Sequence, residues 1–149
     1  MPPVAPVENR IADQLMTALN LIVGGANWLT NPSKAEGTPG NALAQPVTNP
    51  QLYLQFVRTI PNGQDSVPAR HAWRSYFTVW IVAKDLRSMM DAKGDVLRAL
   101  YQQEATIISA LGQPAWPDDF TYRDEMSTAA LAVGAQSVLV DYDTDHTNP

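Results

Sequence analysis

The sequence contains no cysteine, few charged side chains and no long apolar run, and each absence excludes a class of protein. Without cysteine the chain forms no disulfide and has no thiolate chemistry, which fits a reducing compartment or one in which covalent cross-links are unnecessary. No apolar stretch approaches the roughly 20 residues that a membrane-spanning helix needs. The opening residues MPPVAPVENR also lack the pattern of a signal peptide. We therefore expect no membrane association.

Positive charge is scarce as well. The formal net charge of −5 argues against a generic nucleic-acid clamp, which needs clustered cations to displace counterions from phosphates, but it permits a surface along which nucleic acid slides. Charged residues make up only 17% of the chain, below the quarter or so that is usual in soluble domains, so we expect partners to cover part of the surface. The length of 149 residues predicts a single domain, 1–149.

The stretch His71–Val82 has the highest density of aromatic and β-branched residues in the chain. Both of its alternating faces are apolar, as in a strand that lies centrally beneath helices or turns one face towards another subunit. Gln51–Ile60 predicts a second strand, and the Pro-Asn-Gly turn signal at 61–63 follows it. We expect these two strands to form an antiparallel pair.

Apolar residues at helical spacing predict one helix over Val7–Val23 and a second that begins near Asp91–Asp95 and ends at Leu111. Ser137–Asp143 alternates cleanly and predicts a closing strand, while Phe120 to Tyr122 and Ala129–Val133 give weaker strand signals. Gly134 is interpreted as a break, and Trp116 is expected in a loop.

The remaining segments are an extended Pro-rich arm at 1–6, a long Pro- and Gly-rich loop at 26–50 and a polar tail at 144–149. A connection as long as 26–50 is typically either disordered or used for binding. Trp28 favours binding, but it equally fits a ring that folds back over the end of the first helix. Together these elements predict an α+β fold with a mostly antiparallel sheet of about four strands and two helices packed on one face.

Two acidic clusters are the nearest approach to a site of chemistry. Asp141, Asp143 and Asp145, followed by His146, offer oxygen ligands for a hard cation, but the cluster lacks the glycine and bidentate glutamate of a calcium loop. We interpret it as a solvated acidic terminus and expect no metal. The second cluster is interpreted as a charged loop or half of a subunit contact rather than a catalytic pair; it comprises Asp118, Asp119, Asp124 and Glu125. No nucleophile, base and oxyanion donors can be named together, so we expect no enzyme activity and no cofactor.

Five segments carry a resemblance to a known family. They are the opening helix VENRIADQLMTALNLI, the first strand around QLYLQFVRT, the aromatic strand RHAWRSYFTVWIVAKD, the helix DVLRALYQQEATIISALG and the closing strand QSVLVDYDTD. In order and pattern they resemble the tail-terminator family of long-tailed bacteriophages, also called tail-completion or minor tail proteins. The resemblance covers nearly the whole chain, although the first loop is longer and richer in proline than the family pattern.

The resemblance implies a structural virion protein, made in the bacterial cytoplasm, that forms a hexameric ring at the head-proximal end of the tail. Such a ring ends polymerisation of the tail-tube protein and joins tail to head through a neck or connector protein, while DNA passes through the lumen without specific binding. A ring interface needs two complementary surfaces on each subunit. The candidate interface residues are Trp28, Arg70, Arg74, Trp80, Trp116, Asp118 and Asp119, with Arg70 and Arg74 facing the acids of a neighbouring subunit.

Three other functions stay open on the sequence. A neck or head-completion protein shares the small size and ring formation. A monomeric binding module would use the loop 26–50 to grip a ligand. A small hydrolase would use the acidic clusters.

Overall fold

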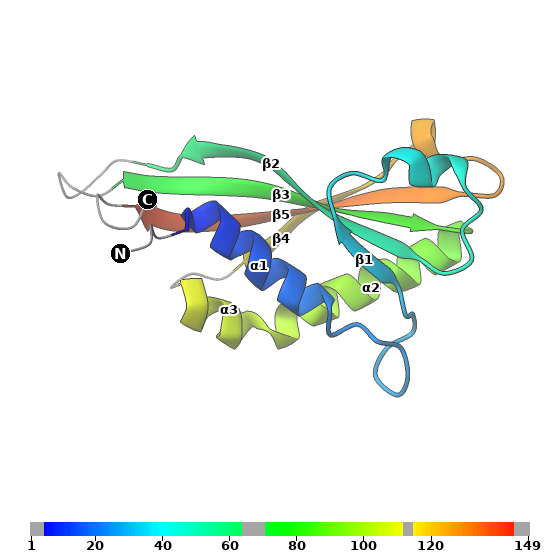
Figure 1. Cartoon of the computed structure of the whole chain (residues 1–149), viewed down its shortest axis with the longest axis horizontal. Helices are drawn as coiled ribbons and strands as arrows, with labels where there is room; N and C mark the ends of the chain where they lie inside the picture. Colours follow the sequence, from blue (N-terminus) through cyan, green and yellow to red (C-terminus); the bar gives the residue numbers. More distant parts are fainter. Residues whose placement is uncertain (1–4, 64–70, 112–114, 145–149) are drawn as a thin grey trace.

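The computed structural model describes residues 5–63, 71–111 and 115–144, with the side chains of 108–111 left aside. A five-stranded sheet in the order β1-β2-β3-β5-β4 carries three α-helices on one face (Figure 1). The helices are α1 (Val7–Leu19), α2 (Leu86–Gln102) and α3 (Glu104–Leu111). The strands are β1 (Ser33–Glu36), β2 (Gln51–Pro61), β3 (His71–Ala83), β4 (Ala115–Tyr122) and β5 (Ala132–Thr144), and two short 3-10 helices are η1 (Gly40–Ala44) and η2 (Asp124–Met126).

The aromatic strand is the centre of this sheet, and the α+β class is confirmed. β3 pairs antiparallel with β2 on one side and with β5 on the other, which confirms the predicted strand pair. Its alternate residues Phe77, Val79 and Ile81 are almost fully buried beneath the helices. The apolar stripe of each helix packs on this face, and the two sets of side chains form the main core.

A second, smaller core covers one end of the opposite face of the sheet. Val82 and Val133 project there from β3 and β5, and the chain around η1 and η2 folds over them through Val47 and Leu131. Trp80 packs at the edge of this cluster. The helix-free face is therefore partly covered by the protein's own loops, and its other end stays open.

Several predicted details of the fold are wrong. The sheet has five strands rather than about four, because β1 lies within the segment 26–50 that was predicted as a loop and pairs parallel to β2. The second predicted helix is two helices, α2 and α3, so three helices cover the sheet. Within the described ranges, no helix is long and apolar enough to cross a membrane.

Gly134 does not break a strand; it lies within β5, and Trp116 lies on β4 rather than in a loop. A Cβ atom at position 134 would lie 2.5 Å from Cζ of Phe120 and 3.0 Å from the sulfur of Met89. The missing side chain therefore makes room for a ring from β4 and a thioether from α2. Here glycine is a packing residue inside a strand rather than a signal for its end.

Gly134→Ala is accordingly expected to lower the free energy of unfolding by about 2 kcal/mol, because a methyl group forced into a filled space strains its neighbours. Urea unfolding measures the change. Phe120→Leu removes the ring atoms that the new methyl group meets, so the double variant should lose clearly less stability than the two single changes added together. Additive losses would contradict the packing role of the glycine.

Candidate functional site

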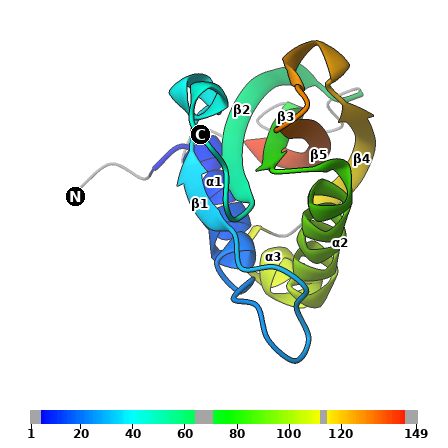
Figure 2. The ribbon, with the colours of Figure 1, turned by 90° about the vertical axis from the view of Figure 1, so that its right-hand side faces the viewer.

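The open end of the helix-free face contains a shallow depression of about 390 Å³. Seen end-on, the sheet is strongly curved, with β2 and β4 on either side of β3 and β5 and the helices below (Figure 2). The depression crosses all four of these strands and is lined by Val57, Arg58, Tyr76, Thr78, Asp118, Asp119 and Ser137. Its one cation, Arg58, comes from β2, whereas its two acids, Asp118 and Asp119, come from β4, on the other side of β3 and β5.

Two predicted interface residues, Asp118 and Asp119, line this depression, and a third, Trp116, lies on the same strand. Asp118 and Asp119 lie at an irregularity in β4, where their carbonyl oxygens accept hydrogen bonds from the side-chain amide of the buried Gln136. Trp116 lies across from Leu139 and is 49% exposed. The buried Gln136 amide therefore fixes the backbone of the two acids, and the exposed indole lies on the same strand two residues before them.

Arg74 has a partner within its own chain. It pairs across the sheet with Asp141 on β5, donating from Nε at 2.7 Å and from Nη2 at 3.1 Å to the two carboxylate oxygens. These hydrogen bonds raise the pKa of the Arg74 guanidinium above its ordinary value. Contact between Arg74 and acids of a neighbour stays a prediction, and Arg70 lies outside the described residues.

Trp80 is only partly buried and faces the smaller core. Its indole N–H donates to the Gln55 side chain at 2.7 Å, and the guanidinium of Arg123 lies 5.3 Å from its ring centroid. Because the loops around η1 and η2 cover this end of the sheet, Trp80 contributes to the contact between loops and sheet. Its predicted place in a contact between subunits stays a prediction.

Trp28 folds back on its own chain, as one of the two sequence interpretations expected, but over α2. Its ring packs against the main core, and the guanidinium of Arg98 lies 5.5 Å from the ring centroid. Beside it, the fully buried carboxylate of Asp95 accepts hydrogen bonds from the backbone N–H and the hydroxyl of Thr30, at 2.9 and 2.5 Å. Asp95 therefore fixes the start of the long segment against α2.

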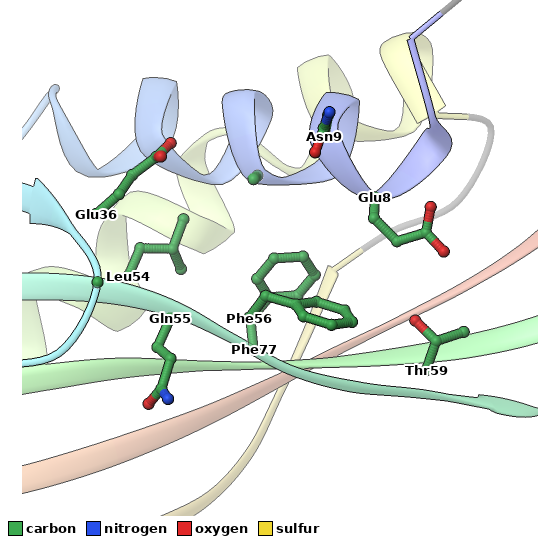
Figure 3. Close-up of a pocket in the computed structure, with 10 residues that line it drawn as sticks. Glu8, Asn9, Glu36, Leu54, Gln55, Phe56, Thr59 and Phe77 are labelled. Atoms are coloured by element: carbon green, nitrogen blue, oxygen red, sulfur yellow. The ribbon is translucent and has the colours of Figure 1, made fainter.

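A larger groove, of about 620 Å³, lies between α1 and β2. β1 pairs only with Gln51–Leu54, so the second half of β2 has no neighbouring strand on this edge within the described residues. Figure 3 shows the rings of Phe56 and Phe77 in the middle of the groove, with Glu36 to one side and Glu8 to the other. The groove thus has an aromatic floor and two carboxylates at its rim.

A polar network fixes one end of this groove. The Tyr142 hydroxyl donates to Glu8 at 2.8 Å and lies 2.9 Å from the hydroxyl of Ser75, which in turn lies 2.6 Å from that of Thr59. Burial raises the pKa of the Tyr142 phenol above its ordinary value. The network joins the first turn of α1 to β5, β3 and β2, so the position of the Glu8 carboxylate is set by three strands.

The acidic clusters do not assemble into a site of chemistry in the described residues. Asp141 is paired with Arg74, Asp143 is exposed, and Asp145 and His146 fall outside the described ranges. Among the side chains that the structure describes, no three potential metal-ligating groups lie together. Asp124 and Glu125 form η2, away from Asp118 and Asp119 in the sheet irregularity.

Sequence reasoning missed both the groove and Asp95. The groove forms where β1 stops short along β2, and β1 carries no apolar alternation that would reveal it. Asp95 had a usable signal: it occupies the apolar stripe of α2, between the buried Ala92 and Val96. A charged residue at such a position indicates a buried hydrogen-bonding partner, because an unpaired buried charge is strongly unfavourable.

Comparison with known proteins adds no assignment. The sequence matches no protein-family model and no curated protein.

Proposed function

We propose that this protein is a non-enzymatic structural subunit that forms a ring, of six copies by its family resemblance, at the head-proximal end of a bacteriophage tail tube. The ring ends tube polymerisation and joins the tail to the neck of the head, and DNA passes through its lumen. The net charge of −5 suits a channel to which DNA does not adhere.

The observation that carries the proposal is the spread of large apolar side chains over separate exposed surfaces. Trp116 and Val57 lie at the helix-free face, Phe56 lies in the groove, and Leu86 and Met90 lie at the start of α2. A closed ring repeats one contact between two different patches, so each subunit must carry two complementary surfaces. Exposed apolar patches of this kind mark contact sites in soluble proteins.

Light scattering of the purified protein over a concentration series tests the proposal, with negative-stain imaging of the same samples. We expect rings of about six subunits, or a monomer that becomes a ring when tail-tube protein is added. Tail tubes assembled in its presence should also stop growing, whereas tubes assembled alone should continue.

A monomer at every concentration that never joins tail tubes would overturn the proposal. The alternative of a monomeric binding module would then rest on the depression of about 400 Å³ that Trp28 and Leu29 form with Arg98. Leu29, 71% exposed beside this depression, is the feature that favours the alternative.

A further inference from the structure

The groove between α1 and β2 has the properties of a docking site for another protein. Its floor is apolar, formed by Leu54, Phe56 and Phe77, and Phe56 is 49% exposed. Its charged lining residues are both acids, Glu8 and Glu36. Such a surface favours a partner that presents apolar side chains flanked by cations.

The protein carries a matching surface at the junction of β3 and α2, which we call the α2 corner and define as Lys84, Leu86, Arg87 and Met90. All four side chains are exposed, Leu86 by 55% and Met90 by 45%. Leu86 and Met90 are four residues apart in α2 and share one helix face. The corner therefore presents two exposed apolar side chains, and in the sequence a cation precedes Leu86 and another follows it.

Of the Lys and Arg residues that the structure describes, the two cations of the corner are the least engaged within the chain. Among the described side chains, the other Lys and Arg residues form ion pairs, lie over aromatic rings or hydrogen-bond to carbonyl oxygens, and Arg10 also interacts within the chain. Within the described part of the chain, Lys84 and Arg87 have only an electrostatic interaction with Asp85, whose carboxylate accepts a hydrogen bond from the backbone N–H of Ser88 at 2.8 Å. The Asp85 charge is therefore held at the start of α2.

The two surfaces lie at different places on one molecule. In Figure 1 the groove runs from the start of α1, in the left part of the molecule, to β1 near the middle, whereas the junction between β3 and α2 is at the right-hand end. A subunit cannot place its own corner in its own groove. A second copy can, and repetition of that contact runs head to tail, as a ring requires.

From this complementarity we propose that the α2 corner of one copy docks in the groove between α1 and β2 of the next. Leu86 and Met90 contact the floor around Phe56, and Arg87 faces Glu36. This inference rests on the proposed ring and names its interface. It also gives a role to the exposed acid Glu36 and to the two exposed cations of the corner.

Charge reversal of an exposed pair tests the docking without disturbing the core. Glu36→Arg and Arg87→Glu should each raise the dissociation constant between subunits by about tenfold or more, because each places like charges together. The double variant, Glu36→Arg with Arg87→Glu, should restore association to within about threefold of the starting protein. Glu104→Arg reverses another exposed acid, outside the groove, and should leave association unchanged.

A second pair of variants, one in the contact and one control, tests the apolar part of the contact. Leu86→Ser should weaken association by about tenfold, whereas Tyr101→Ser, which removes a 62% exposed apolar side chain near the other end of α2, should not. Sedimentation velocity on each variant, with and without tail-tube protein, measures the effect. Circular dichroism confirms that each variant is folded.

Two outcomes separate this inference from the proposed function. Rings that form normally in the Glu36→Arg and Leu86→Ser variants would overturn the docking mode and leave the ring in place. A double charge reversal that associates no better than the single changes would likewise contradict the pairing of Glu36 with Arg87. Failure of the unaltered protein to assemble, even with tail-tube protein, would overturn both the ring and this interface.

Discussion

Asp95→Ala is expected to lower the free energy of unfolding by about 3 kcal/mol, because it removes a buried acceptor and leaves its donors without a partner. The Asp95 carboxylate is fully buried on α2 and accepts hydrogen bonds from Thr30, from the backbone N–H of Leu29 and from Arg98. It is the main polar link between α2 and the chain that leads to β1. Urea unfolding of the variant measures the loss.

A local measurement separates this role from a general loss of packing. Amide hydrogen exchange at Leu29 and Thr30 should accelerate in Asp95→Ala under native conditions, while exchange in β3 follows only the global loss of stability. Asp13→Ala, an exposed acid on α1, is the matched control and should change stability by less than about 0.5 kcal/mol. Unaltered exchange at Leu29 and Thr30 would contradict the role of Asp95.

Phe77→Ala is expected to cost about 4 kcal/mol, since it empties the centre of the main core. Phe77 is 1% exposed on the central strand, under α1, and its ring meets that of Phe56 edge-on with centroids 5.6 Å apart. Phe56 is half exposed in the groove. The two phenylalanine rings are in contact and differ mainly in burial. We therefore expect the loss of stability to be much larger at Phe77 than at Phe56.

Phe56→Ala is thus the natural control and should cost about 1 kcal/mol. The double variant measures the coupling between the rings, expected to be about 1 kcal/mol for an edge-on pair. Thermal unfolding monitored by circular dichroism gives all three values. Equal losses for the two single variants would show that the groove is closed in solution.

The long elements could be predicted from the sequence because their side chains repeat with the period of the structure. The aromatic strand, predicted over His71–Val82, extends over His71–Ala83, and the first strand of the pair begins at the predicted Gln51. The first helix begins at the predicted Val7 but ends at Leu19, four residues early. In each case burial on one face selects the pattern.

The elements that were missed are held by backbone pairing or by a single close contact, neither of which leaves a periodic pattern. β1 is four mostly exposed residues, SKAE, that form a strand only because β2 offers a free edge. β5 continues through Gly134 because a distant ring fills the space. The groove was missed because its lining residues come from four separate elements, α1, β1, β2 and β3, and so form no pattern along the sequence.

The position of β5 has a consequence for the order in which the protein folds. β5 follows every other described strand in sequence, yet it lies between β3 and β4. During synthesis, β3 and β4 therefore emerge from the ribosome before the strand that joins them, and the pairing of β3 with β5 brings together residues as far apart as His71 and Thr144. Such distant contacts slow folding. The curved face of the sheet exists only once β5 has inserted, so nascent subunits cannot present that face to one another.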